Sequence, residues 1–276
     1  KWEDKVCVFS MTYYYCELSV TRKILMLAFT KYKDMNFNID KEIENFEKEN
    51  NMNFAVSQKE AIRGAVENGV EIITGGPGTG KTTIINCIIR LFEKAKLKVL
   101  MGAPTGRAAK RMSESTKREA KTIHRLLEMG VGSDEEALFF SRGEQSPLQC
   151  DVVIIDEASM IDIVLMNNLL KAVSMGTRLI IVGDAEQLPS VGPGNVLRDF
   201  IDSKCIKVVR LKEIFRQSKE SIIVNAHKIN SGEMPILNKK NKDFYFIRCQ
   251  NPSDILDTLV GLIDKRLPSF NSSWNK

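Results

Sequence analysis

Short apolar runs alternate with amphipathic stretches along the chain after residue 57. Five such runs, each rich in Val, Ile or Leu, lie at 70–74, 98–103, 151–156, 177–182 and 206–209. The stretches 82–94 and 162–173 space their apolar residues as one face of a helix does. Continuous apolar strands separated by helices are typical of a parallel sheet covered on both faces. The pattern therefore predicts an α/β fold.

The beginning of the chain departs from this rhythm. Residues 11–29 are apolar and aromatic, which predicts a helix, or a strand followed by a helix. Residues 34–53 are rich in Asn, Lys and Glu, and their apolar residues are spaced as in a connecting helix. We therefore expect 1–53 to form an N-terminal helical segment or the end of a preceding domain.

Two later segments also interrupt the alternation. The segment 128–149 contains three glycines and Pro147 around a short apolar run, which predicts a small hairpin. After Arg210 the pattern restarts, with a helix expected at 221–229, a strand at 243–248 and a helix from 253 to about 266. This restart indicates the first part of a second α/β domain.

The composition is that of an ordinary globular protein, with 43% hydrophobic and 27% charged residues. No apolar run approaches the ~20 residues that a bilayer crossing needs, and the N-terminal residues lack the regions of a signal peptide. The six cysteines form no C-x-x-C pair, which favours reduced thiols. We expect a cytoplasmic protein without membrane contact, and a fragment or processed product because no initiator Met is present.

The net charge of +5 is concentrated in one stretch. Residues 103–125 hold seven basic residues against two acidic ones, so the rest of the chain is neutral overall. A local excess of Lys and Arg indicates either a contact with a polyanion or a solvated helix face. Charge alone leaves both interpretations open.

A phosphate-binding loop directly follows the first apolar run. The residues GGPGTGKT at 75–82 fit G-x-x-x-x-G-K-[ST] between a predicted strand and a predicted helix. The glycines let backbone N–H groups turn toward phosphates, and the helix N-terminus adds partial positive charge. Lys81 would then reach the β- and γ-phosphates of ATP, and the Thr82 hydroxyl would bind Mg²⁺. The other predicted nucleotide-binding residues of this segment are Gly75, Gly76, Pro77, Gly78, Thr79, Gly80 and Thr83.

Two acidic residues end the third apolar run. Asp156 and Glu157 follow the β-branched residues 152–155, at the sheet edge where the phosphate loop is expected. Asp156 is the second candidate Mg²⁺ ligand, and Glu157 is the candidate general base for the attacking water. Together with the loop they predict nucleotide hydrolysis; the alternative is a strand that merely ends in acidic turn residues.

Several segments between residues 54 and 232, taken in order, resemble the motifs of superfamily 1 helicases. Among these, they resemble the RecD-like DNA helicases related to the exodeoxyribonuclease V alpha subunit. The segment AVSQKEA at 55–61 is similar to the glutamine motif that reads adenine, with Gln58 as its glutamine. The segment DEASM at 156–160 is similar to the acidic motif of this family.

Further motifs extend the resemblance. GDAEQLPSVGPG at 183–194 is similar to the motif in which a glutamine, here Gln187, senses the γ-phosphate. LKEIFRQ at 211–217 is similar to the opening motif of the second motor domain, with Arg216 as an arginine finger. APTGRAAKR at 103–111 is similar to a motif that grips single-stranded DNA. The implied DNA contacts are Pro104, Thr105, Gly106, Arg107, Lys110, Arg111 and His124, the last with helix packing as an equal alternative.

The resemblance implies a P-loop NTPase with a RecA-like parallel sheet flanked by helices. It implies an ATP-binding motor domain at 54–205, with 128–149 in the place of a strand-separating pin. Residues 206–276 would begin a second RecA-like domain that is truncated. It also implies an ATP- and Mg²⁺-dependent helicase or translocase that moves 5′-to-3′ on single-stranded DNA in recombination or repair. Its partners would be nuclease and helicase subunits if it belongs to an exodeoxyribonuclease V-type complex.

One departure leaves other functions open. Nothing after residue 232 resembles the two further motifs of a second motor domain, one for DNA and one supplying another arginine. The alternatives are a truncated, non-catalytic module that holds nucleotide or DNA, and a non-motor P-loop ATPase.

Overall fold

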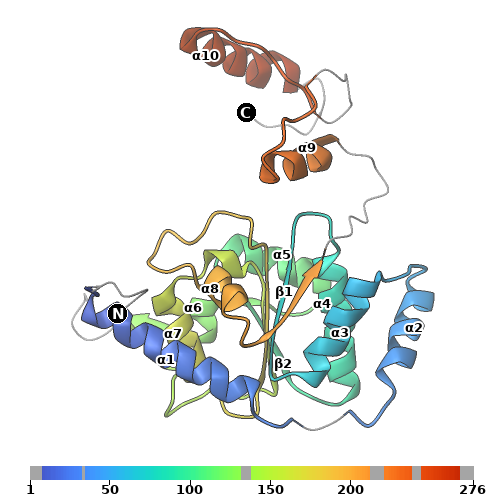
Figure 1. Cartoon of the computed structure of the whole chain (residues 1–276), viewed down its shortest axis with the longest axis vertical. Helices are drawn as coiled ribbons and strands as arrows, with labels where there is room; N and C mark the ends of the chain where they lie inside the picture. Colours follow the sequence, from blue (N-terminus) through green and yellow to red (C-terminus); the bar gives the residue numbers. More distant parts are fainter. Residues whose placement is uncertain (1–7, 33–34, 132–137, 212–220, 238–243, 268–276) are drawn as a thin grey trace. The chain divides into compact units, whose positions relative to one another are not determined.

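A computed structural model of the chain describes residues 8–32, 35–131, 138–211, 221–237 and 244–267. The chain divides into two units, Lys1–Gln217 and Ser218–Lys276. The first unit is built on a six-stranded sheet with the order β3-β2-β6-β7-β1-β8, and every neighbouring pair is parallel (Figure 1). Its strands are β1 (Val70–Gly75), β2 (Val99–Ala103), β3 (Lys121–Thr122), β6 (Val152–Ile155), β7 (Arg178–Gly183) and β8 (Lys207–Leu211). This arrangement confirms the predicted α/β fold with a parallel sheet.

Helices cover both faces of this sheet, because alternate side chains of its central strands point to opposite sides. Ile72 and Ile155 belong to one apolar cluster, and Ile73 and Ile154 belong to the other. The first cluster includes residues of α1 (Met11–Ala28), α6 (Ile123–Leu126), α7 (Ile163–Ala172) and α8 (Val196–Ser203). The second includes residues of α2 (Ile39–Glu49), α3 (Val56–Glu67), α4 (Lys81–Lys94) and α5 (Gly106–Thr116). Figure 1 shows the two layers on either side of the strands.

The N-terminal segment packs on the sheet domain. Residues 11–28 form one helix, α1, rather than a strand followed by a helix. Its buried residues Cys16, Val20, Ile24 and Leu27 are spaced three or four apart, so they form one face, and this face packs on α7. Burial of an aliphatic side chain of this size stabilises a fold by about 1.5–3 kcal/mol.

The last strand of the first unit lies beyond the boundary that the sequence predicts. That boundary, at 205/206, assigns β8 to a second domain. In the structure β8 pairs with β1 over Glu71–Gly75 and Lys207–Leu211, and the division between the units falls after Gln217. The reason is physical: β8 is apolar at Val209 and Leu211, and both side chains are buried in the second apolar cluster.

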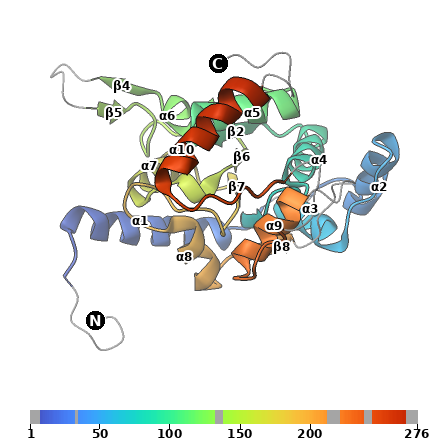
Figure 2. The same ribbon diagram turned by 90° about the horizontal axis from the view of Figure 1, so that it is seen from above.

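Outside the main sheet, β4 (Met129–Val131) and β5 (Leu138–Phe140) pair antiparallel, in the segment where a hairpin is expected (Figure 2). The second unit contains α9 (Ser221–Asn230), α10 (Pro252–Gly261) and the short helix η2 (Leu262–Arg266). The strand predicted at 243–248 is not found: residues 244–248 have no strand pairing. Of the helices in the described ranges, none has the length and apolar character that a membrane crossing requires.

One carboxyl group lies inside the sheet. Glu71 sits in β1 between β7 and β8 and is fully buried. Neither of its carboxyl oxygens has a hydrogen-bond partner among the described residues. Burial raises the pKa of Glu71 to about 9, although Lys207 opposes the shift. The side chain fits because α3 carries Gly64 here, where a Cβ atom would lie 2.0 Å from Glu71 Oε1.

This burial predicts a pH-dependent stability. In the unfolded chain Glu71 loses its proton near its ordinary value of 4.5, whereas in the folded protein it keeps the proton up to about 9. The folded state therefore binds more protons, and stability falls as the pH rises between these values. Glu71→Gln should make the midpoint of thermal unfolding less dependent on pH between 5 and 8, which calorimetry at several pH values measures.

Glu44→Gln is the matched control, because Glu44 is an exposed carboxylate on α2. Its profile should run parallel to that of the wild type. Equal slopes for the wild type and Glu71→Gln would show that Glu71 is not the group that titrates.

Candidate nucleotide-binding site

The predicted phosphate loop connects β1 to α4. Gly78 and Gly80 have φ values of +79° and +84°, which favour glycine because a Cβ atom is strained there. Lys81 is the first residue of α4, and its Nζ donates to the carbonyl oxygens of Gly75 at 2.5 Å and Gly76 at 3.0 Å. The ammonium group thus lies within the loop, at the end of the helix whose unpaired N–H groups favour an anion.

Gln58 holds this loop from the side. It is 2% exposed, and its Nε2 donates to the carbonyl oxygen of Thr79 at 2.9 Å. Its Oε1 accepts from the backbone N–H of Ala55 at 3.0 Å and so caps the start of α3. The proposed reading of adenine by Gln58 stays a prediction. The contact with the loop is an additional role that sequence spacing does not show, because it joins residues 21 positions apart.

Carboxylates from two further strands surround Lys81. Asp156 and Glu157 follow β6, and Asp184 follows β7, which lies between β6 and β1 in the sheet. The negative charges of all three act on Lys81. Sequence reasoning assigns no role to Asp184, although the signal is present: it is an acidic residue at the carboxyl end of an apolar strand, as Asp156 is. Asp184 is 4% exposed, and its Oδ1 accepts from the N–H of Glu186 at 3.0 Å.

Burial shifts the pKa values of two central groups, Lys81 and Asp156. It lowers the pKa of Lys81 from its ordinary value, while Asp184, Asp156 and Glu157 oppose the shift. Burial likewise raises the pKa of Asp156, against a hydrogen bond from the N–H of Glu157 to Asp156 Oδ1 at 2.8 Å. A phosphate beside Lys81 would favour its charged form, and a cation beside Asp156 would favour the carboxylate.

Glu157 has an unusual backbone and a specific partner. Its φ and ψ of 54° and 41° are left-handed, and it precedes the short helix η1 (Ala158–Met160). The guanidinium Nη2 of Arg111 donates to Glu157 Oε1. The structure therefore joins a residue predicted to contact DNA to the predicted general base.

The predicted DNA-contacting residues lie around the start of α5. The Thr105 hydroxyl caps this helix by accepting from Ala108 N at 3.2 Å. Arg107, Lys110 and Arg111 are exposed, whereas Ala108, Ala109 and Met112 on the other side of the helix are buried. Three of the seven basic residues in the stretch 103–125 thus lie on one exposed face of α5.

The other predicted residues are Gln187, His124 and Arg216. Gln187 is exposed in the loop after β7, and its backbone N–H donates to the carbonyl oxygen of Asp184 at 3.2 Å. The His124 ring packs on Phe140 of the hairpin, with centroids 6.0 Å apart. Arg216 falls outside the described residues, so its role as an arginine finger stays a prediction.

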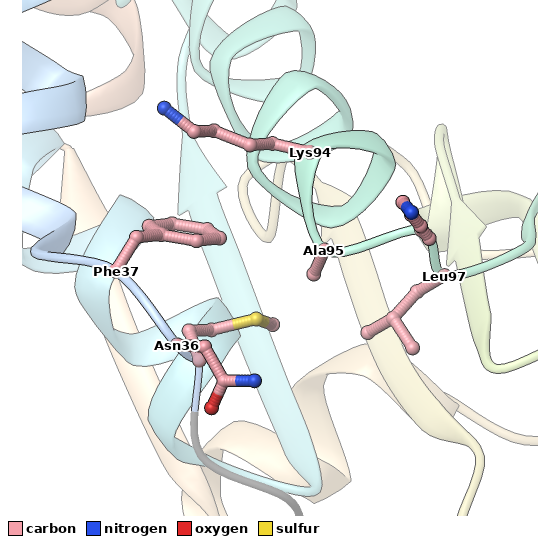
Figure 3. A pocket seen from close by; sticks show the side chains of 7 residues that line it. Asn36, Phe37, Lys94, Ala95 and Leu97 are labelled. Carbon is pink, nitrogen blue, oxygen red and sulfur yellow. The ribbon is translucent and has the colours of Figure 1, made fainter.

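One cavity among the described residues lies away from this site. It has a volume of about 540 Å³ and is lined by residues 35–37 and 94–97 (Figure 3). It lies at the C-terminal end of α4, about 20 Å along the helix from the phosphate loop. The Lys94 ammonium there lies 5.5 Å from the centre of the Phe37 ring and 2.7 Å from Glu42. We therefore place the candidate site at the loop, on the chemistry of its residues.

The chain is similar in sequence to one family model and to several known helicases. Residues 58–193 match the family model described as an AAA domain. The chain is 40% identical over 165 residues to the ATP-dependent RecD2 DNA helicase of Deinococcus radiodurans, an alignment that covers 59% of this chain and 22% of that protein. It is 38% identical over 173 residues to the RecBCD enzyme subunit RecD of Mycobacterium tuberculosis, with 54% of this chain and 29% of that protein covered. A crystal structure of Pif1 helicase from Candida albicans aligns with a TM-score of 0.48 and 25% identity, over 67% of this chain and 45% of that one.

These matches identify the region around the site. The match to the AAA domain model covers 58–193, the region that holds the phosphate loop and the acidic residues. The chain is a homologue of RecD and RecD2 helicases over more than half of its length, which confirms the resemblance drawn from its motifs. It spans less than a third of the length of these two relatives.

The contact between Gln58 and the loop can be tested through Gly80. In Gly80→Ala, the new Cβ would lie 2.4 Å from Gln58 Nε2, at a φ of +84°. We expect Gly80→Ala to lower the melting temperature and to weaken binding of a fluorescent ATP analogue, because both the backbone and Gln58 must move. The left-handed backbone alone costs about 1–2 kcal/mol.

Gly176→Ala isolates that backbone cost, since Gly176 has a φ of +88° and a Cβ there would meet no atom of the described residues within 4 Å. It should lose stability without losing nucleotide affinity. Adding Gln58→Ala to Gly80→Ala should restore part of the lost stability. Equal losses of stability and affinity in both alanine variants would contradict the proposed support of the loop by Gln58.

Proposed function

We propose that this chain is the ATP-hydrolysing part of a RecD-like DNA helicase motor that moves on single-stranded DNA. The observation that carries the proposal is that the phosphate loop with its carboxylates and the basic face of α5 meet at one edge of the sheet. Lys81 of the phosphate loop interacts with the carboxylates of Asp156, Glu157 and Asp184, and the exposed basic face of α5 reaches Glu157 through Arg111. The homology to RecD and RecD2 helicases supports the same function.

The residues present fit an ATP·Mg²⁺ complex. Thr82 and Asp156 offer a hydroxyl and a carboxylate oxygen, the hard ligands that Mg²⁺ prefers. Bound there, Mg²⁺ would neutralise charge on the β- and γ-phosphates. Lys81 would exchange the carbonyl oxygens of Gly75 and Gly76 for phosphate oxygens. The N-terminus of α4 would add its partial positive charge.

Hydrolysis would depend on Glu157 as general base. Its carboxylate would accept a proton from the water that attacks the γ-phosphate, and such a base contributes about 10²–10⁴-fold to the rate. Gln187 would sense the γ-phosphate from the loop after β7, and Arg216 would stabilise the charge of the transition state. Loss of the γ-phosphate would then release these groups and let the DNA-binding face shift along the strand.

DNA would lie along α5. Arg107 and Lys110 are exposed and lie one turn apart. Pro104 and Thr105 directly precede α5, and Gly106 is its first residue. Such a surface contacts phosphates rather than base edges, so we expect binding that is largely indifferent to sequence. From the resemblance of its motifs to RecD-like helicases, we also propose 5′-to-3′ movement, a role in recombination or repair, and nuclease or helicase subunits as partners.

ATPase measurements test the motor. We expect oligo-dT to stimulate ATP hydrolysis by the wild-type chain. Lys81→Ala should abolish turnover by weakening the hold on the phosphates, and Glu157→Gln should lower it by about 10²–10⁴-fold while preserving ATP binding. A steady-state phosphate-release assay measures each rate, and titration with a fluorescent ATP analogue measures binding.

The other candidate functions predict different results. A non-motor P-loop ATPase would hydrolyse ATP equally well with and without oligo-dT. A non-catalytic module would bind ATP with a flat product time course. Unchanged turnover in Lys81→Ala would exclude the phosphate loop as the site.

The salt dependence of DNA binding tests the α5 face. Each phosphate contact to a single strand contributes about −0.7 to the slope of log K against log salt concentration. Removing two contacts with Arg107→Ala and Lys110→Ala should therefore weaken binding of oligo-dT and make the slope shallower by about 1.4.

The control for this double variant is Arg22→Ala with Lys171→Ala. It removes the same charge from exposed positions on α1 and α7, in the other helix layer. If both double variants bind oligo-dT equally weakly and show the same change in salt-dependence slope, net charge rather than the α5 face governs the binding.

A further inference from the structure

Arg111 and Glu157 form an ion pair across two elements of the candidate site. Arg111 Nη2 donates to Glu157 Oε1, and the residues are 46 positions apart. They meet because β2 and β6 are neighbours in register, with Gly102 opposite Ile155. The start of α5 and Glu157 therefore both lie at the same edge of the sheet, just after these two strands.

The ion pair engages one of the two carboxylate oxygens of the proposed general base. A base must lie within hydrogen-bond reach of the proton that it removes, with a lone pair free to accept it. The guanidinium takes one lone pair on Oε1 and holds the carboxylate toward α5, so it restrains the direction in which the remaining lone pairs can accept a proton. The charge of Arg111 also reaches the neighbouring groups, since it contributes to lowering the pKa of Lys81 and opposes the rise in the pKa of Asp156.

The same arginine is also open to a second partner. The Arg111 side chain is 66% exposed, while that of Glu157 is only 16% exposed. Arg107 and Lys110 lie one turn or less before it, on the face proposed to contact DNA. Arginine binds phosphate through paired hydrogen bonds that match those to a carboxylate. A backbone phosphate on this face and the Glu157 carboxylate would therefore compete for one guanidinium.

We propose that Arg111 is a positioning residue that restrains Glu157 and releases it when a DNA phosphate takes its place. The restraint keeps ATP hydrolysis slow without DNA, and the exchange couples strand binding to turnover. Because the Arg111 side chain is exposed, a DNA phosphate can reach the guanidinium and replace the carboxylate. The inference rests on the proposed function, because it takes Glu157 as the base and α5 as the DNA-binding face.

The rate of hydrolysis without DNA gives the first test. Arg111→Gln should raise this basal rate about two- to five-fold, the factor that a weak ion pair represents. It should also reduce the ratio of DNA-stimulated to basal rate. Arg118→Gln is the matched control, because Arg118 lies in the same basic stretch and pairs with Glu93 instead. Its basal rate should equal that of the wild type.

DNA binding without ATP gives a second test, which does not depend on turnover. If the two partners compete, Glu157→Gln should bind fluorescent oligo-dT about two- to five-fold more tightly than the wild type. The gain should disappear when Glu157→Gln is made in the Arg111→Gln background. A double-mutant cycle separates this coupling from the general effect of removing a negative charge.

The outcomes distinguish the inference from the proposed function. An unchanged or lower basal rate in Arg111→Gln would overturn the inference. So would an affinity gain that persists in the double variant. In either case, stimulation of the wild type by DNA would still uphold the proposed motor function. A raised basal rate in Arg111→Gln without any DNA stimulation of the wild type would uphold the restraint and contradict the motor.

Discussion

The structure of the first unit depends on one constraint: the parallel, in-register pairing of β2, β6, β7 and β1. Parallel strands end at the same edge of a sheet, so the residues that follow them come together although they are distant in sequence. The loop before Lys81, the acidic residues Asp156 and Glu157, and the residue Asp184 all follow these strands. The two apolar layers fix this pairing, because a slip of one residue would turn every buried side chain to the wrong face.

Electrostatics at this edge follow from the same constraint. The strands place Lys81 among three carboxylates in partly buried surroundings, where opposite charges interact more strongly than in water. Burial opposes the charged forms of Lys81 and Asp156, and a bound phosphate and a bound cation would each favour those charged forms. The ion pair between Arg111 and Glu157 extends this charged network to the surface of α5.

Much of this arrangement could be predicted from sequence because it is local. The apolar runs and the glycine pattern identified the strands, the loop and the acidic motif, and helical spacing identified α4, α7 and α9. The contacts of Gln58 with the loop and of Arg111 with Glu157 join distant segments, which spacing does not reveal. The addition of β8 to the first sheet depends likewise on pairing with β1. The predicted strand at 243–248 shows the converse: an apolar and aromatic run does not form a strand without a partner to pair with.

The central claim is that the loop at Lys81 receives the phosphates of ATP with Asp156 and Glu157 facing them. A crystal structure of this chain with a non-hydrolysable ATP analogue and Mg²⁺ tests it most directly. We predict that Lys81 Nζ leaves the carbonyl oxygens of Gly75 and Gly76 for phosphate oxygens, with the terminal phosphate beside Asp156 and Glu157. An analogue bound elsewhere, or Lys81 still held by the two carbonyl oxygens beneath bound phosphates, would contradict the account.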